Sequence, residues 1–416
     1  MSVEDVRLIE DLPRFTELEA EDFGRDFDAI AEDLYGRSYV GPYQGAGGSL
    51  VVFTNDDVRR LAALPEATHP TSEGASAAWH EKAPEDCENL VRFMEVGTFV
   101  KRQPEHLPVK KLFTKRLTLG NVRRHTDSLR DAIRTEVDRI ADGSVVDLVD
   151  DFARPVIVRY WAEVLGIAIE ESQQLADYAA QFQLSSLFDP SFEQLTLANE
   201  AAGKYLELFT SVLERGARAG TPELPFGLEQ DFLAMSDVGR PDNPHTTFAG
   251  GAVDGLHTLA SGIANAVHSL ITEPSALAEV RADRNLIADA TQESLRLHPS
   301  VVVTPRAALR DIDFDGLKVP AGTLLSLVWL LANRDPSVWE APEEFRLNRP
   351  DRHRQVTFGG GPYVCGGRNL VRIVFEVALD EVTAPGVEIA PAGPVEWVPA
   401  SMLHEPATMP VTVRRK

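Results

Sequence analysis

Cys365 is the residue of this 416-residue sequence whose surroundings most clearly suggest chemistry. Three consecutive glycines, Gly359 to Gly361, precede it, and glycine lets a backbone bend tightly or lie flat against a bulky ligand. An amphipathic segment follows from Leu370 to Phe375. We therefore expect Cys365 at the N-terminus of a helix, where backbone N–H groups favour thiolate over thiol. No second Cys or His follows at zinc-ligand spacing, which favours a cofactor that brings four ligands of its own.

The whole loop resembles the haem-binding loop of the cytochrome P-450 family, Phe-Gly-x-Gly-x-His-x-Cys-x-Gly-x-x-Leu-Ala-Arg. Seven positions match: Phe358, Gly359, Gly361, Cys365, Gly367, Leu370 and Arg372. The sequence departs at Tyr363, where the family usually has His or Arg for a haem propionate, and at Val371, where Ala is usual. The resemblance implies that Cys365 is the thiolate ligand of a haem iron. The alternative is a glycine-rich turn that leads into a helix with a buried, inert cysteine.

A second motif, Gln-Glu293-Ser-Leu-Arg296, resembles the Glu-x-x-Arg helix of the same family. Side chains three residues apart share a helix face, so this carboxylate and guanidinium can meet. In the family an arginine ahead of the haem loop completes the pair, and Arg349 occupies that place. The resemblance implies a buried structural lock beneath the loop. The alternative is an exposed salt bridge that contributes almost nothing to stability.

The apolar segment 248–271 resembles the family helix that crosses the oxygen-binding face of the haem. Its consensus there is Ala/Gly-Gly-x-Asp/Glu-Thr, and alignment on Gly255 and Thr258 puts His257 in place of the usual acid. Cleavage of dioxygen needs two protons, and histidine exchanges protons near neutral pH. We expect His257 and Thr258 to act as a relay, with Asp254 as a second candidate acid. Alternatively, His257 points away and only forms hydrogen bonds in the helix packing.

Haem propionates are anions that need donors or cations, and the resemblance suggests four. His106 and Lys110 are one helical turn apart and match a His-x-x-x-Arg pattern, with Lys in place of Arg. Arg306 matches an arginine on a family strand, and Tyr363 can donate a neutral hydrogen bond. Lysine lacks the bidentate fork of arginine, so we expect weaker or rearranged anchoring at that position.

Composition agrees with one large domain over residues 1–416. Hydrophobic residues make up 44% of the chain, which is enough for a large core. The sequence shows neither a run of about twenty apolar residues nor an export signal, and only Cys87 accompanies Cys365. We therefore expect a cytoplasmic protein without structural disulfides.

The net charge of −23 argues against general nucleic-acid binding. One stretch is basic nevertheless: Lys101, Arg102, Lys110, Lys111, Lys115, Arg116, Arg123 and Arg124. In the family this stretch lies near the residues equivalent to Arg368 and Arg372, where an acidic ferredoxin docks. The alternative is a solvated helix face.

Several segments are expected around a substrate pocket. The run 49–53 predicts a strand, as do 301–303 and 324–331. Residues 65–97 read as an irregular loop over the pocket, and 182–192 as a mobile lid. The pocket lining is expected from Val301, Val302, Val303, Thr304 and the turn 401–404, which includes Met402 and Leu403.

The resemblance covers about residues 100 to 375. It implies a mainly α fold with a small β region, a triangular helical prism with haem b between two long helices. It also implies a monooxygenase that inserts one atom of O2 into a small or medium apolar substrate, fed by a ferredoxin and its NAD(P)H-dependent reductase. Peroxide-driven oxidation, or oxidative coupling or rearrangement, is the first alternative, because the usual acid is missing. A non-catalytic haem sensor or electron carrier is the second.

Overall fold

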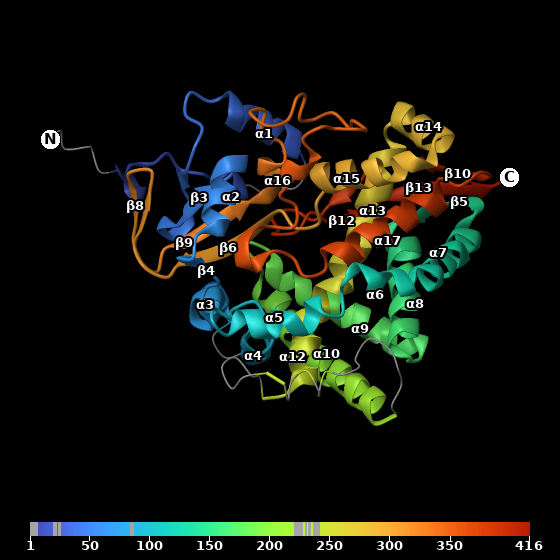
Figure 1. The fold of residues 1–416 in the computed structure, drawn as a ribbon, viewed down its shortest axis with the longest axis horizontal. Helices are drawn as coiled ribbons and strands as arrows, with labels where there is room; N and C mark the ends of the chain where they lie inside the picture. The colour runs from blue at the N-terminus through green and yellow to red at the C-terminus, as the bar shows by residue number, and fades with distance from the viewer. Residues whose placement is uncertain are drawn as a thin grey trace.

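The computed structural model describes residues 7–19, 23, 26–83, 87–219, 228, 231, 234–235 and 242–416. A β-rich region near the N-terminus lies beside a larger region of helices, and the C-terminus lies at the opposite end of the molecule (Figure 1). The mainly α fold with a small β region is therefore confirmed. Among the described residues, no helix is both long and apolar enough to cross a bilayer.

The helices account for most of the chain. Their bounds are α1 Phe27–Gly36, α2 Asn55–Ala63, α3 Ser72–Lys82, α4 Glu88–Val96, α5 His106–Thr114, α6 Leu119–Arg124, α7 Thr126–Ile140, α8 Arg154–Leu165, α9 Ile169–Phe182, α10 Phe192–Ala219, α12 Pro244–Ala252, α13 His257–Ile271, α14 Pro274–Ala282, α15 Ile287–Leu297, α16 Trp329–Ala332 and α17 Arg368–Val382.

The largest sheet has the strand order β2-β3-β9-β6-β4. These strands are β2 Tyr43–Gln44, β3 Leu50–Val52, β9 Leu324–Val328, β6 Val303–Ala308 and β4 Ala67–Thr68. β3 runs parallel to β9, with Leu50 opposite Leu325, and the other pairs are antiparallel. The strand predicted at 49–53 is confirmed. The other two predictions were partly wrong: only Val303 of 301–303 enters a strand, and 324–331 divides into β9 and α16.

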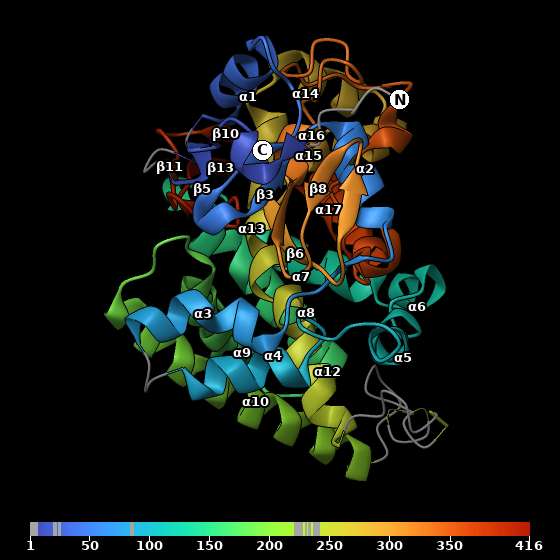
Figure 2. The same ribbon diagram turned by 90° about the vertical axis from the view of Figure 1, so that its left-hand side faces the viewer.

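Three smaller sheets complete the β structure. They are β1 Arg7–Leu8, β8 Leu317–Val319 and β7 Ile312–Phe314; then β10 Val387–Pro391, β13 Pro410–Arg415 and β5 Asp142–Asp147; and finally β11 Glu396–Trp397 with β12 Pro406–Thr408. Figure 2 shows the β-rich region standing above the layer formed by α3, α4, α9 and α10.

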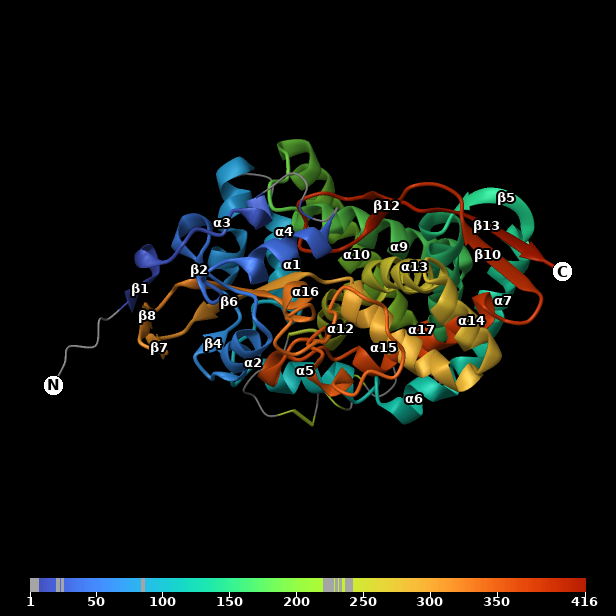
Figure 3. The same ribbon diagram turned by 90° about the horizontal axis from the view of Figure 1, so that it is seen from above.

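Helix α13 runs through the centre of the helical region, among α9, α15 and α17 (Figure 3). All its residues from Leu259 to Ile271 are buried except His268, as expected for a helix surrounded by protein. The segment 248–271 was read as one helix, but the structure interrupts it between Ala252 and His257 with a 3-10 turn, Val253–Gly255.

Two side-chain hydrogen bonds satisfy the carbonyls that the interruption releases. Trp161 Nε1 donates to Gly255 O at 2.7 Å, and Thr258 Oγ1 donates to Asp254 O. A Cβ atom on Gly251 would lie 2.2 Å from the Phe113 ring, so glycine is needed there for the close approach of α5. In an uninterrupted helix, backbone N–H groups would bind these carbonyls. Here side chains bind them instead, so the surrounding side chains stabilise the break.

Residues 65–97 are not irregular, and that prediction was wrong. They contain α3 and α4, with residues 84–86 outside the described part. Thr71 caps α3 by accepting a hydrogen bond from Gly74 N at 3.0 Å. Ser72 and Gly74 lie in the first turn of α3 and Gly97 ends α4, whereas Ser76 is buried within α3. A role for this segment over a substrate pocket stays a prediction.

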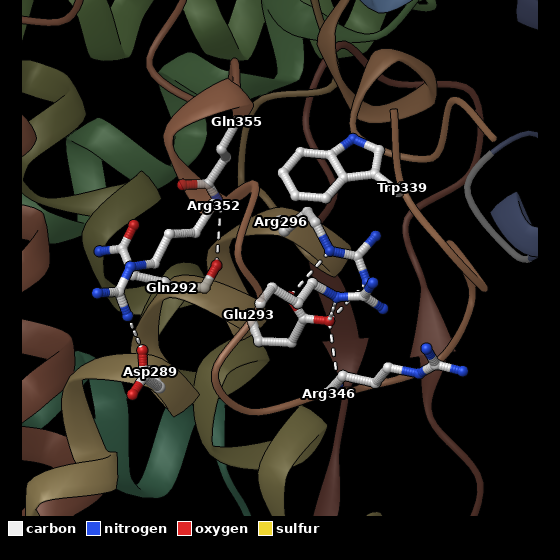
Figure 4. A pocket seen from close by; sticks show the side chains of 9 residues that line it. Asp289, Gln292, Glu293, Arg296, Trp339, Arg346, Arg352 and Gln355 are labelled. Atoms are coloured by element: carbon white, nitrogen blue, oxygen red, sulfur yellow. Dashed lines mark hydrogen bonds and ion pairs between the residues drawn. The ribbon is translucent and has the colours of Figure 1, made fainter. Parts of the chain in front are cut away.

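Glu293, Arg296 and Arg349 meet in the interior, where each is less than 10% exposed. Arg296 donates two hydrogen bonds to the two carboxylate oxygens of Glu293, at 2.9 and 2.7 Å, and Arg349 Nε donates a third at 2.6 Å. Figure 4 shows Glu293 and Arg296 beside the Trp339 ring, around a cavity of about 10 Å³, which holds about one water molecule at most. The alternative of an exposed salt bridge is excluded.

The remaining guanidinium N–H groups extend the cluster into the loop that follows α16. Arg296 and Arg349 donate to the backbone carbonyls of Asn333, Glu340, Ala341, Pro342 and Glu344. These carbonyls lie in a segment without regular structure, so the arginines replace the partners that a helix or sheet would provide.

Asn333 and Thr357 connect this cluster to the Cys365 loop, and neither was anticipated. Asn333 Oδ1 accepts from Val356 N at 2.9 Å, and its amide donates to Thr357 Oγ1 at 2.8 Å. Thr357 in turn donates to Leu295 O of α15 at 2.7 Å. The chain is thus fastened to α15 immediately before the glycines.

Replacement of Glu293 by alanine should leave two buried guanidinium groups without their carboxylate. Loss of one partner from a buried ion pair costs about 3–5 kcal/mol. We expect Glu293→Ala to give little folded protein, with a large drop in thermal midpoint for what remains. Asp289→Asn is a matched control on the same helix, because Asp289 pairs with the largely exposed Arg352. Equal thermal midpoints for the two variants would contradict the structural role of Glu293.

Candidate functional site

The Cys365 loop is held in shape by its glycines and by the backbone. Gly359 and Gly361 have φ angles of +71° and +62°, a region that other residues rarely adopt. A Cβ on Gly361 would lie 2.0 Å from Ala62 O, so α2 also requires glycine there. Cys365 N donates to Phe358 O at 2.8 Å, which closes the loop on itself.

The sulfur of Cys365 lies just ahead of α17 and accepts a hydrogen bond from Gly367 N at 3.3 Å. Burial nevertheless raises the pKa of the Cys365 thiol, and the Gly367 N–H only partly offsets this. The Gly367 N–H thus favours the thiolate, as expected at a helix N-terminus, but desolvation of the charged form is the larger effect. Binding to a metal, which removes the thiol proton, would stabilise the thiolate instead.

Asp254 and Thr258 approach the same region from the interrupted central helix. Asp254 has an exposed side chain, and Thr258 and Cys365 are partly exposed. Desolvation is nevertheless the main influence on both Asp254 and Cys365, and the Asp254 charge helps to raise the pKa of the thiol. Asp254 is exposed although Val253 and Leu256 on either side of it are buried and the helix that follows is surrounded by protein, so its carboxylate faces a space inside the helical region. Its charge reaches the Cys365 thiol, which lies in the same region.

Four ionisable or polar groups predicted from the sequence gather together, with a fifth that was missed. The ring centroids of His106 and Tyr363 are 4.5 Å apart, and the Arg306 guanidinium lies 4.9 Å from the Tyr363 ring. Lys110 Nζ donates to Pro362 O and Val364 O, so it fastens the Cys365 loop from α5. His69 packs on Tyr363 at 4.0 Å and was not anticipated, since no family pattern marks it.

The cluster of positively ionisable side chains around Tyr363 has no anionic partner among the described residues. Burial, followed by repulsion from Lys110 and Arg306, lowers the pKa of His106 to about 4. Burial also lowers the pKa of Lys110 to about 8 and that of Arg306 to about 10. Both ring nitrogens of His106 and Nε of Arg306 are buried without a hydrogen-bond partner, and no described carboxylate forms an ion pair with these groups. Such positively ionisable groups suit a ligand with carboxylates.

His257 contacts a carboxylate that sequence reasoning missed. Its Nε2 forms a short hydrogen bond with Glu405, which follows the turn 401–404. Both side chains are only slightly exposed, at 11% and 12%. The two residues are far apart in the sequence, so only the fold brings them together. The acid that the central helix lacks is thus present next to His257 on another segment.

The expected substrate-pocket residues divide into two groups. Val301 is partly exposed and pairs with Leu403, and Met402 N donates to Ser186 O at 3.0 Å. Val302, in contrast, is fully buried in the hydrophobic cluster that contains Phe27 and Leu330, so its assignment to the lining was wrong. Val303 belongs to the same cluster, where it is 4% exposed.

Thr304 and His404 are also engaged in the packing. Thr304 Oγ1 accepts a hydrogen bond from Trp329 Nε1 at 2.9 Å. His404, in the expected turn, stacks on Trp397 at 4.0 Å and is buried. The turn and the 182–192 segment touch, because Phe188 N donates to Ala400 O at 2.8 Å and Leu187 pairs with Ser401.

The residues present fit a haem. A single sulfur and an interior space lie beside a cluster of buried donors that lack an anion, as a metal-bearing macrocycle with carboxylates requires. A protein-only metal site is not supported, since the described residues contain no group of three or more His, Cys, Asp or Glu side chains able to hold a metal ion.

Comparisons with known proteins agree with this geometry. The family model for cytochrome P-450 matches residues 245–382. The chain is 27% identical to a biotin biosynthesis cytochrome P-450 of Bacillus subtilis over 285 residues, 67% of this chain and 70% of the relative. It is 28% identical to a vitamin D3 dihydroxylase of Streptomyces griseolus over 314 residues, 74% of this chain and 75% of the relative.

Solved structures share the fold over almost the whole chain. P450BioI, in complex with an acyl carrier protein that carries hexadec-9Z-enoic acid, superposes with a TM-score of 0.82 at 21% identity, covering 94% of this chain and 99% of that one. The epothilone D-bound P450epoK also gives 0.82, at 22% identity, covering 97% and 99%. The cysteine loop and the donor cluster lie in the expected places, and the chain is similar to the haem-thiolate monooxygenases of the cytochrome P-450 family, in sequence over 67–74% of its length and in fold over almost all of it.

Proposed function

We propose that this protein holds haem b through Cys365 and inserts one oxygen atom of O2 into a small or medium organic substrate of largely apolar character. The observation that carries the proposal is the Cys365 loop, held by Lys110 beside a cluster of buried donors, His106 and Arg306, that have no anionic partner among the described residues. The names of relatives such as the vitamin D3 dihydroxylase support oxidation of a largely apolar molecule.

When bound, the haem would supply two-electron activation of dioxygen. The protein's own residues would do the rest. Cys365 would hold the iron, and His106 and Arg306 would bind the propionates. The Tyr363 hydroxyl already bonds to Thr68 Oγ1 at 2.7 Å, so Tyr363 would contribute mainly its ring, which packs on His106 and Arg306. Lys110 already bonds to the loop carbonyls, so it would stabilise the loop and contribute its charge rather than a direct contact. The aromatic ring of Phe358, with Arg372 5.3 Å from its centroid, would pack beside the sulfur.

Replacement of Cys365 by serine should remove the thiolate. We expect the reduced carbon monoxide complex of the unmodified protein to show the red-shifted Soret band of a thiolate-ligated haem, and Cys365→Ser to lose it. Cys87→Ser is the matched control, because Cys87 is buried elsewhere in the core. A thiolate spectrum that survives in Cys365→Ser would overturn the assignment.

Proton delivery would use His257 and Thr258, with Glu405 behind them. Glu405 accepts or shares a proton at His257 Nε2, and His257 lies next to Thr258 on α13. Thr258 Oγ1 donates to Asp254 O and can also accept from a water molecule in the pocket. A carboxylate, an imidazole and an alcohol would thus replace the usual acid and alcohol.

His257→Ala should divert at least about tenfold more reducing equivalents into peroxide, since a general acid contributes that much or more to rate. Thr258→Ala and Glu405→Gln should uncouple as well, and a peroxide-driven assay should bypass part of each defect. The single change His257→Asp would place two carboxylates together, so the double variant His257→Asp with Glu405→Gln is the one expected to restore coupling. Unchanged rate, coupling and pH profile in His257→Ala would exclude the relay.

An acidic ferredoxin would dock on a proximal basic patch, which we define as Lys111, Lys115, Arg123, Arg124 and Arg368, all exposed. The patch borders the Cys365 loop, because Asn369 donates to Leu117 O at 3.1 Å between α6 and α17. Not every residue of the basic stretch is available. Arg116 is buried and pairs with Asp231 at 3.0 Å, and Lys115, although exposed, pairs with the same carboxylate at 2.5 Å.

Charge reversal tests the patch. The double variant Arg123→Glu with Arg124→Glu should raise the KM for a [2Fe–2S] ferredoxin by roughly tenfold or more at low salt, since like charges at an interface oppose binding. The effect should shrink as salt increases. Arg7→Glu with Arg310→Glu, near the β1/β8 sheet, makes the same charge change elsewhere and should leave KM unchanged. Equal KM values for the two double variants would contradict docking at this face.

A further inference from the structure

Asp254 places a carboxylate where the family motif has a small side chain. When Gly255 and Thr258 are aligned with the family motif, Asp254 takes the first position, where the family has Ala or Gly. In the structure it lies in the 3-10 turn of the interrupted helix, with its own carbonyl bound by Thr258. The position faces a space inside the helical region, in the same part of the protein as the Cys365 thiol. An ionisable group at this point is costly unless something pairs with it.

The carboxylate lacks a cation of its own. Among the described residues, no lysine or arginine forms an ion pair with Asp254, although its side chain is exposed to the interior space. Burial raises the pKa of its carboxyl to about 6, and His257 and Gln183 only partly offset that. The group is therefore largely ionised at neutral pH and open to a ligand.

The charges around His257 do not balance. Asp254 and Glu405 are two carboxylates, and the His257 imidazole, which bonds to Glu405, can carry at most one positive charge. Glu405 occupies its Nε2. Even with His257 protonated, the three groups together keep one negative charge beside the pocket. The pocket is thus complementary to one positive charge on a ligand.

A second polar group in the same region has no hydrogen-bond partner. Tyr205 is completely buried in α10, and its hydroxyl has no hydrogen-bond partner. Burial raises the pKa of Tyr205, and the Asp254 charge adds to that shift, so the two groups lie in the same region of the protein. The Tyr205 ring packs between Phe93 and Phe209, with centroids at 5.9 and 5.6 Å, which fixes where the hydroxyl lies. A buried hydroxyl without a partner is costly, and a polar ligand atom would relieve that cost.

We propose that the substrate carries a positively charged nitrogen on a largely apolar body, and that Asp254 binds this nitrogen with Tyr205 beside it. The proposal rests on the proposed function of the same site and narrows its substrate class. Asp254 then acts as a specificity-determining residue, since a neutral isostere of the substrate would leave the carboxylate desolvated and unpaired.

A matched ligand pair tests the charge alone. Benzyltrimethylammonium and neopentylbenzene have the same shape and differ by one nitrogen in place of carbon. The quaternary nitrogen has no lone pair, so it cannot ligate iron in the manner of simple amines. Binding to the haem-loaded protein is measured by the low-to-high spin shift and, because a ligand can bind without it, by calorimetry. Asp254→Asn should weaken the cation by about 10- to 100-fold, as expected for loss of a charged interaction.

Three controls make the result decisive. Neopentylbenzene should bind Asp254→Asn as well as the unmodified protein or better. Asp138→Asn, which removes an exposed carboxylate on α7, should change neither affinity. Asp254→Ala, which restores the small residue of the family motif, replaces Asp254→Asn if the latter fails to fold.

Two outcomes would overturn the inference. One is an unchanged affinity for the cation in both Asp254 variants. The other is loss of coupling with unchanged affinity, which would assign Asp254 to proton delivery instead. In either case a normal carbon monoxide spectrum of the variants would show that the proposed haem-thiolate site stands. Absence of that spectrum from the unmodified protein would be a failure of the proposed function itself.

Discussion

The buried carboxylate of Glu293 is the interaction on which the rest of the structure depends. Two arginines donate to it from different segments, and both use their remaining N–H groups on carbonyls of the same irregular loop. Neither charge could be buried alone, because desolvation would exceed any packing gain. Together they fix a segment that has neither helix nor sheet. Asn333 then connects this segment by a hydrogen bond to the backbone just before the Cys365 loop.

The Cys365 loop is held in place by contacts from several elements. Lys110 binds its carbonyls from α5, and α2 approaches Gly361 too closely for any other residue. Its own backbone bond from Cys365 to Phe358 completes the shape. These contacts settle where the sulfur lies, while burial raises the pKa of its thiol. A site that resists ionisation on its own and is stabilised by a cation is suited to metal binding.

The interrupted central helix provides the opposite side. Trp161 and Thr258 take the carbonyls released at the break, so the chain can turn Asp254 and Thr258 toward the interior without loss of backbone hydrogen bonds. Asp254 and His257 are then three residues apart but have different surroundings. His257 meets Glu405 across the fold, whereas Asp254 faces the interior space. This difference separates a group suited to proton transfer from one suited to recognition.

The sequence alone determined the family resemblance, the cysteine, the Glu293 and Arg296 pair and the mainly α fold, because these follow from short patterns and local spacing. It even indicated His106, Lys110 and Arg306, which the structure brings together. The prediction of an irregular loop at 65–97 was wrong, because it relied on composition and overlooked the helix-capping residues. The prediction that Val302 lines the pocket was wrong, because its burial depends on residues distant in the sequence. Glu405, His69, Tyr205 and Asn333 could not be found in this way. Their roles arise from contacts between segments far apart in the chain, and only tertiary packing decides which buried polar groups gain partners and which are left to a ligand.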